Sequence, residues 1–227
     1  MNDIFFSPHP DDIAYSCFGA IHASLNKKII VTVYPVSCYS FDSTQNDVTE
    51  TTTLRKKEDR LFAKSENADL VFLDYADSSI TMLAPKKNNN LGLDHDIHLV
   101  LTNNSPSNIY LPIAIGWHTD HINLRNTILS IVKKNKQLVN KVYLYEDLPY
   151  ACDFSTIDYY NEIKKLTEHM NMRIINPIMI DISTCIEQWK KMVKSYKSQF
   201  NQDEYRRIFD YKSKNGFFSE KIWEIQV

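Results

Sequence analysis

Short apolar runs alternate with longer amphipathic segments over most of the chain. The run over residues 28–36 is rich in β-branched side chains, a pattern typical of a strand buried on both faces. Over residues 49–67, apolar side chains recur at helical spacing among charged ones, which predicts an amphipathic helix. By these criteria we expect strands over 3–7, 28–36, 69–73, 108–112 and 141–145, helices over 12–25, 49–67 and 94–103, and a further helix ending near residue 137.

This alternation predicts an α/β protein. Strands joined by helices run parallel, and the connecting helices pack on the sheet. We therefore expect a Rossmann-like, three-layer fold with a mostly parallel sheet and helices on both faces. In such a sheet the functional crevice lies outside the carboxyl ends of the strands, near the point where the strand order reverses. The length of 227 residues favours a single domain spanning 1–227.

The C-terminal part of the sequence is less regular. Residues 173–182 have the pattern of a strand pair or an edge segment, and residues 185–200 that of a long helix. The remaining tail is aromatic and charged, without a clear period. Polar loops are expected over 41–48 and 77–90.

Composition excludes several classes of protein. A hydrophobic share of 43% with 24% charged residues is that of an ordinary globular protein. The net charge of −2 provides no basic field, so we expect no nucleic-acid partner. No apolar run approaches the ~18 residues of a transmembrane helix, and the N-terminal residues lack the features of a signal peptide. Four widely spaced cysteines predict free thiols in a reducing, cytoplasmic setting.

The first candidate site follows the first expected strand. The segment Ser7–Asp12 (SPHPDD) places His9 and Asp12 three residues apart across a strand-to-helix turn, so both side chains can face one point. An imidazole and a carboxylate suit Zn²⁺, although Asp11 or Asp12 would also serve as a helix cap. Since no Gly-x-Gly-x-x-Gly stands here, a dinucleotide-dependent oxidoreductase is excluded.

The second candidate site follows the fourth expected strand. In the segment Gly116–His121 (GWHTDH), His118 and His121 are three residues apart, and Asp120 lies beside both. The preceding glycine allows a close backbone approach. The alternative is a pair of solvated histidines at a helix start, with Thr119 or Asp120 as the cap.

A third segment has similar spacing but a different position. Asp94–His98 (DHDIH) contains H-x-x-H, and such pairs arise by chance in a chain with seven histidines. It precedes the fourth strand, whereas the first two motifs follow the strands that flank the expected crevice. We therefore expect no metal at this third segment.

Together, the first two motifs supply enough groups for a catalytic metal centre. His9, Asp12 and His121 provide three protein ligands and leave a fourth position open. Asp11 and His118 then remain as free acid–base groups. Amide hydrolysis needs a water nucleophile at neutral pH, a polarised carbonyl and a proton for the leaving amine, and a site of this composition can provide all three.

Further segments extend this pattern. LRKKED over 54–59 lies between the two motifs, KMVKSYKSQ spans 191–199, and YEDLPY spans 145–150. With SPHPDD and HTDH, these segments resemble the PIG-L/LmbE-like family of zinc-dependent N-acetyl deacetylases, including its R-x-x-E helix and the Lys…Tyr-x-Ser-Gln helix of bacterial members. Ile13 and Phe18-Gly19 stand where many members carry Glu and Gly-Gly, a departure that bears on substrate fit near the mouth of the site.

The resemblance implies a role for each motif residue. The zinc ligands fall on His9, Asp12 and His121. The general base falls on Asp11, and the electrophilic histidine on His118.

Two more residues acquire implied roles in substrate binding. Arg55 matches a substrate-contacting arginine, and Asp77, after the third strand, matches a contact to a sugar hydroxyl. From the residues alone, an ion pair between Arg55 and Glu58 on a solvated helix face is the simpler interpretation.

The resemblance thus implies a hydrolase that uses Zn²⁺ to remove an N-acetyl or other N-acyl group from a small-molecule amino sugar or amino-sugar conjugate. The alternative from another class is a catalytically inactive sugar- or nucleotide-binding module on the same fold. Bound zinc on the purified protein distinguishes the two. The sequence leaves open which sugar and acyl group are used, and whether the protein forms a homo-oligomer.

Overall fold

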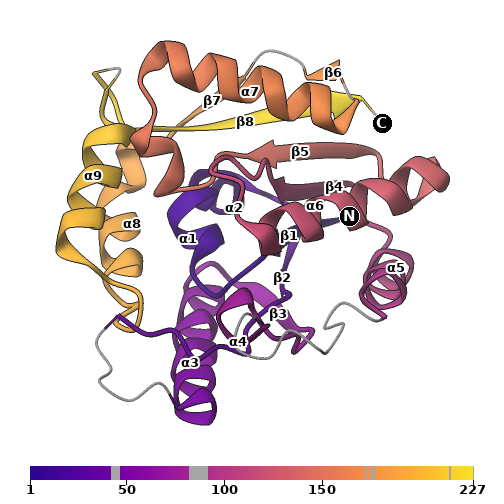
Figure 1. Cartoon of the computed structure of the whole chain (residues 1–227), viewed down its shortest axis with the longest axis horizontal. Helices are drawn as coiled ribbons and strands as arrows, with labels where there is room; N and C mark the ends of the chain where they lie inside the picture. The colour runs from indigo at the N-terminus through magenta and orange to yellow at the C-terminus, as the bar shows by residue number, and fades with distance from the viewer. Residues whose placement is uncertain (42–46, 82–91, 172, 175–176, 215, 227) are drawn as a thin grey trace.

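One sheet organises the molecule. The computed structural model describes residues 1–41, 47–81, 92–171, 173–174, 177–214 and 216–226. Within them the sheet has eight strands in the order β3-β2-β1-β4-β5-β8-β6, and β7 also pairs with β8 (Figure 1). Strands β1 to β5 are parallel, whereas β8 is antiparallel to β5, β6 and β7. The strands are β1 (Asn2–Ser7), β2 (Lys27–Thr32), β3 (Ala68–Phe72), β4 (Asn108–Pro112), β5 (Lys141–Tyr145), β6 (Arg173–Ile174), β7 (Ile178–Asp181) and β8 (Ser219–Gln226).

The five expected parallel strands are present, although β2 ends at Thr32 and not at residue 36, and their order places the crevice. From β1 the chain builds β2 and β3 on one side, then crosses back to place β4 and β5 on the other. Phe5 of β1 pairs with Ile30 of β2 and with Tyr110 of β4. Because the order reverses between β1 and β4, the loops that leave their carboxyl ends diverge there.

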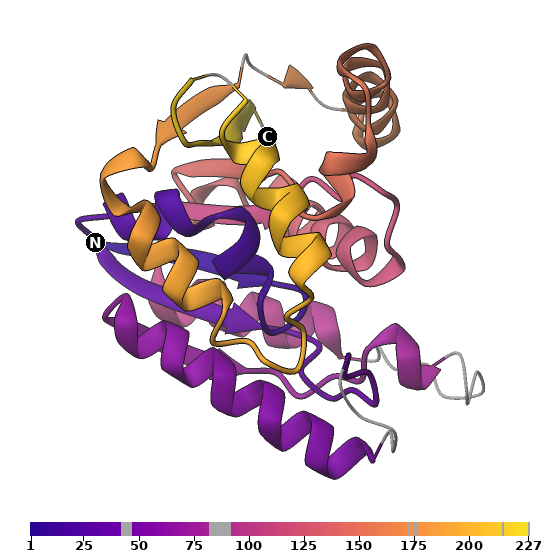
Figure 2. The same cartoon turned by 90° about the vertical axis from the view of Figure 1, so that its left-hand side faces the viewer.

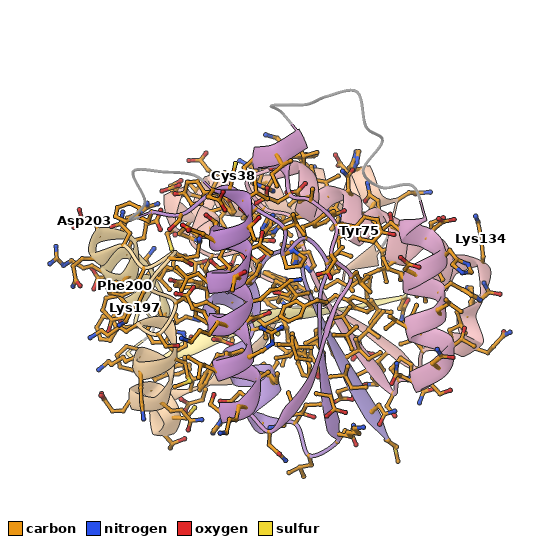
Figure 3. All side chains as sticks on the ribbon, turned by 90° about the horizontal axis from the view of Figure 1, so that it is seen from below. Cys38, Tyr75, Lys134, Lys197, Phe200 and Asp203 are labelled. Carbon is orange, nitrogen blue, oxygen red and sulfur yellow. The ribbon has the colours of Figure 1, made fainter. Side chains whose placement is uncertain are left out.

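Helices cover both faces of the sheet, as predicted. Helices α1, α2, α3 and α8 lie on one face, and α5 and α6 lie on the other (Figure 2). Figure 3 shows α3 and α5 on opposite sides of the strands. Right-handed crossovers between parallel strands produce this arrangement. The helices are α1 (Asp12–Ser16), α2 (Phe18–Ala23), α3 (Val48–Ser65), α4 (Ser78–Thr81), α5 (Leu93–Asn104), α6 (Thr119–Lys134), α7 (Thr156–Met170), α8 (Ile186–Val193) and α9 (Gln202–Lys212), with 3-10 turns η1 (Lys136–Leu138), η2 (Tyr150–Asp153) and η3 (Ser183–Cys185).

The long helix predicted over 185–200 is wrong in its second half. Helix α8 ends at Val193, and short turns follow it. Beyond them, the backbone N–H and the hydroxyl of Ser198 both donate to the Glu58 carboxylate of α3, at 2.9 and 2.5 Å. At Ser198 the buried N–H is therefore satisfied by a carboxylate of α3 and not by the carbonyl of a continuing helix.

The C-terminal tail is more ordered than its composition predicts. It forms α9 and then β8, which extends the sheet beyond β5. Buried side chains of β8, such as Ile222, Trp223 and Ile225, do not follow a strict alternation, which hides the strand from a pattern search.

Smaller differences concern the other connections. The helix expected over 12–25 is two short helices that meet at Cys17, and α7 has no counterpart among the expected elements. The edge segment over 173–182 is present as β6 and β7. The loops expected over 41–48 and 77–90 lie mostly outside the described residues. Among the helices that are described, none is long and apolar enough to cross a bilayer.

Candidate active site

A cavity of about 450 Å³ contains every site residue predicted from the sequence. It lies at the carboxyl ends of β1 and β4, where the strand order reverses. The loops after β1, β3 and β4 and the helix α3 contribute to it. The predicted residues in its wall are His9, Asp11, Asp12, Arg55, Asp77, His118 and His121.

The loop after β1 turns sharply, so that Asp12 faces back towards His9. Oδ2 of Asp12 accepts a hydrogen bond from the His9 backbone N–H at 2.7 Å. Asp11 has a φ of 108°, which few residues other than glycine adopt. Although Asp11 occupies the N-cap position of α1, its side chain makes no capping hydrogen bond. The two carboxylates therefore face the cavity and not the helix end, contrary to the helix-cap interpretation.

The loop after β4 packs tightly against the rest of the cavity. Gly116 has a φ of 86°, and a Cβ atom there would lie 2.7 Å from Tyr150. The Asp120 carboxylate accepts a hydrogen bond from the Ser78 backbone N–H at 2.9 Å and does not cap α6. The side chain of His121 is buried. The alternative of solvated histidines at a helix start is therefore wrong for His121.

Three side-chain atoms from these two loops, each of a type that can bind a metal, form a nearly equilateral triangle. Nδ1 of His9 lies 3.3 Å from Nε2 of His121 and 3.4 Å from Oδ2 of Asp12. The Asp12 and His121 atoms are 3.6 Å apart. A tetrahedral zinc ion with bonds of about 2.0–2.1 Å separates its ligand atoms by about 3.4 Å. The three atoms are thus spaced like three corners of a zinc coordination tetrahedron.

Two carboxylates fix the orientation of the two imidazoles. Oδ2 of Asp120 lies 2.9 Å from Nε2 of His9, and Oδ1 of Asp147 lies 2.5 Å from Nδ1 of His121. Because a carboxylate accepts hydrogen bonds, we assign the protons to these two nitrogens, which leaves a lone pair on the opposite nitrogen of each ring. Both lone pairs and the Asp12 carboxylate then face one another, an arrangement that favours a cation between them.

The pKa of His9 reflects the same preference for positive charge. Burial alone would lower this pKa, but the hydrogen bonds and charges of Asp12 and Asp120 raise it to about 10. In the absence of a metal, a proton therefore takes the place of the cation. Metal binding at this site must displace that proton.

His118 lies at the edge of the same cluster. One ring nitrogen from each of His9, His118 and His121 lies within 4.8 Å of the other two. These three histidines could therefore also hold a metal ion. Within the described residues, Nδ1 of His118 is buried and has no hydrogen-bond partner. Burial and the neighbouring His9 and His121 lower the pKa of His118 to about 4, so its imidazole is neutral at pH 7. Such a group is suited to binding a metal or a polar atom of a substrate.

The segment Asp94–His98 does not take part in this cluster. It lies on α5, where His95 is exposed and Asp96 accepts a hydrogen bond from the Tyr75 hydroxyl at 2.7 Å. In the part of the chain that the structure describes, no other group of three or more His, Cys, Asp or Glu side chains gathers around one point.

Asp11 lies in the same cavity wall as His9, Asp12 and His121. Burial raises its pKa well above the usual range, and so does the charge of Asp12, whereas Arg55 and His9 act in the opposite direction. A carboxylate with a raised pKa is a stronger base than an ordinary one. This property suits a group that takes a proton from water and passes it on.

Arg55 is buried in the cavity wall and does not lie on a solvated helix face. Its Nη1 donates to Ser37 Oγ at 2.9 Å and lies 3.6 Å from Oδ2 of Asp77. Within the described residues, its Nε is buried without a partner. Glu58 is buried too and accepts its hydrogen bonds from Ser198. The interpretation of a solvated Arg55–Glu58 pair is therefore wrong, and the structure instead brings Arg55 to Asp77.

The loops after β1, β3 and β4 that line this cavity lie within a region that matches a known protein family. The family model described as GlcNAc-PI de-N-acetylase, PIG-L, matches residues 4–132. The chain belongs to the PIG-L family. The matched region includes all seven residues predicted for the site, from His9 to His121.

Relatives of this PIG-L protein include deacetylases. The 2'-N-acetylparomamine deacetylase of Streptomyces fradiae is 23% identical over 219 residues, which cover 88% of this chain and 74% of that protein. The structure of a zinc-inhibited form of teicoplanin deacetylase superposes with a TM-score of 0.78 at 17% identity, covering 100% of this chain and 98% of the other. N,N'-diacetylchitobiose deacetylase from Pyrococcus horikoshii gives a TM-score of 0.68 at 17% identity over 99% of this chain and 83% of the other. At these identities the structures show a shared fold.

Sequence reasoning does not find Asp147, which orients His121, nor the contact between Asp120 and His9. Asp147 also accepts a hydrogen bond from the Ile115 backbone N–H at 3.0 Å, so it joins the loop after β4 to the end of β5. A signal was available. Metal-binding histidines usually donate their second N–H to a carboxylate, and Asp147 follows the strand next to β4.

Proposed function

We propose that this PIG-L protein is a metal-dependent hydrolase that removes an N-acetyl or other N-acyl group from an amino sugar or amino-sugar conjugate. The main observation behind this proposal is the triangle formed by side-chain atoms of His9, Asp12 and His121 in the cavity. The family membership and the deacetylases among its relatives support it. Four free cysteines support a reducing, cytoplasmic setting.

We propose Zn²⁺ as the metal and His9, Asp12 and His121 as its ligands. The spacing of their atoms and the lone pairs directed by Asp120 and Asp147 fit a divalent cation. When bound, zinc supplies a Lewis acid for the amide carbonyl and an acidic water at neutral pH.

Asp11 and His118 are the proposed acid–base groups. Asp11 takes a proton from the attacking water and delivers it to the nitrogen of the leaving amine, so that amide and water yield a carboxylic acid and an amine. His118 donates a hydrogen bond to the carbonyl oxygen as negative charge develops there. Because its pKa is lowered to about 4, His118 acts as a neutral donor and not as an imidazolium.

The inactive binding module is not favoured by any feature of the cavity. Such a module would lack part of the metal-binding set or the base. Here the three proposed ligands, the proposed base and His118 all line one cavity.

Arg55 and Asp77 are proposed to position the sugar. Substituting Arg55→Lys keeps a positive charge next to Asp77 but removes the planar fork that can hold Ser37 and a substrate oxygen together. We expect kcat/KM to fall about ten- to a hundredfold, with the metal content unchanged.

The same substitution at Arg60, which is exposed on the same helix, is the matched control and should leave kcat/KM unchanged. Steady-state kinetics with metal analysis measures both variants. If the Arg55→Lys enzyme keeps the kcat/KM of the parent, Arg55 does not take part in substrate binding.

Assay of a substrate panel tests the proposed function. Zinc-loaded protein is incubated with N-acetylglucosamine conjugates and with mono-N-acetylated di- and triamino sugars, and both acetate and free amine are measured. We expect the two products in equal amounts from at least one compound. Tight binding of a compound without any acetate release would support the inactive module instead.

A further inference from the structure

Part of the cavity wall comes from the C-terminal region, outside the segment that the family model matches. Gln199, Glu204 and Ile208 line the cavity with Tyr39, which lies in the loop after β2. These segments are joined, since Gln199 Nε2 donates to the Tyr39 carbonyl at 3.4 Å and the Phe41 backbone N–H donates to the Ser198 carbonyl at 2.7 Å. Figure 2 shows α9, in yellow, descending along this side of the molecule. These two hydrogen bonds connect the C-terminal part of the wall to the loop after β2.

Two carboxylates in the cavity wall, Asp11 and Glu204, form no ion pair within the described residues, and of these Asp11 is the proposed base. Asp12 faces two histidines, and Asp77 faces Arg55. Glu204, in the first turn of α9, has no ion pair and accepts no side-chain hydrogen bond within the described residues. Arg207, one turn further on, forms its ion pair with Asp153, although its charge also acts on Glu204 and partly offsets the effect of burial on the pKa of Glu204.

An unpaired, half-buried carboxylate is costly unless a ligand compensates it. Glu204 is only partly exposed, and burial raises its pKa. A carboxylate only accepts hydrogen bonds, and a charged donor gives bonds roughly twice as strong as a neutral one. Tyr15 and Tyr150 line the same cavity.

We propose that Glu204 binds a free ammonium group of the substrate. The enzyme then prefers N-acetylated amino sugars that carry at least one further, unacetylated amine. This inference rests on the proposed deacetylase function and narrows its substrate class. Glu204 is a specificity residue in it, whereas Asp11 and the metal ligands carry out the reaction on the acetylated nitrogen.

A matched pair of substrates tests the proposal. One is a mono-N-acetylated diamino sugar, and the other has a hydroxyl in place of its free amine. The parent enzyme should prefer the first, and Glu204→Gln should lower kcat/KM for the first about ten- to a hundredfold, mainly through KM, while changing the second less than about threefold. Asp203→Asn is the control, because this exposed neighbour removes the same charge from the same helix turn outside the cavity.

Two results would overturn the proposal. One is a parent enzyme without preference between the two compounds, and the other is an equal loss for both in Glu204→Gln, which would indicate a structural role. If neither compound nor any other member of the substrate panel is deacetylated, the proposed function fails. Calorimetric binding of the same two compounds to parent and Glu204→Gln then decides the ammonium contact: a preference for the amine that Glu204→Gln abolishes supports it, and equal binding overturns it.

Discussion

Replacing His121 with alanine is expected to remove the bound metal and to reduce deacetylation to background. His121 is buried, its Nε2 lies 3.3 and 3.6 Å from the other two proposed ligand atoms, and Asp147 fixes its ring. Metal analysis of purified His121→Ala should therefore show a fall from about one equivalent to nearly none.

Two further variants test whether the loss of metal is specific to His121 and its hydrogen-bond partner. Asp147→Asn leaves the ligands in place but weakens their support, so metal affinity should fall by about ten- to a hundredfold. The double variant His95→Ala, His98→Ala should keep its full metal content, because these residues lie on α5 outside the cluster. If purified His121→Ala retains a full equivalent of metal, His121 is not a metal ligand.

Replacing Asp11 with asparagine is expected to lower kcat by about two to four decades, the range for losing a general acid–base group. The fold and the metal should be retained. Asparagine has nearly the same size and tolerates the φ of 108° at this position better than most residues, so the backbone strain does not confound the result. Kinetics, metal content and a thermal melt measure the three properties.

Asp74→Asn is the matched control for this variant. Asp74 also has a positive φ, of 59°, but it is exposed and does not line the cavity. Its substitution should leave kcat unchanged. If Asp11→Asn retains kcat within a few-fold of the parent, Asp11 is not the base.

The N-terminal part of the fold could be predicted because its elements have simple periods. Most of strand β2 is β-branched, and the motif loops follow β1 and β4. The rule that ligands bind where the strand order reverses then brings His9 and His121 to one point, which the structure confirms as their location.

What could not be predicted depends on contacts between distant segments. Helix α3 has a polar sequence that suggests a solvated face, yet Arg55 and Glu58 are buried because Ser37, Asp77 and Ser198 satisfy them. Strand β8 is half-covered on both faces and shows no clean alternation. Glu204 reaches the cavity only because α9 packs beside it, and no local pattern reveals this position.

Acetate release before and after metal removal tests the central claim most directly. The protein is assayed on the amino sugars that bind it, as purified, after exhaustive chelation, and after one equivalent of zinc is returned. The account predicts that acetate and free amine appear in equal amounts, disappear with the metal and return with zinc. Acetate release that survives complete metal removal, or no release by protein that holds a full equivalent of zinc, would contradict it.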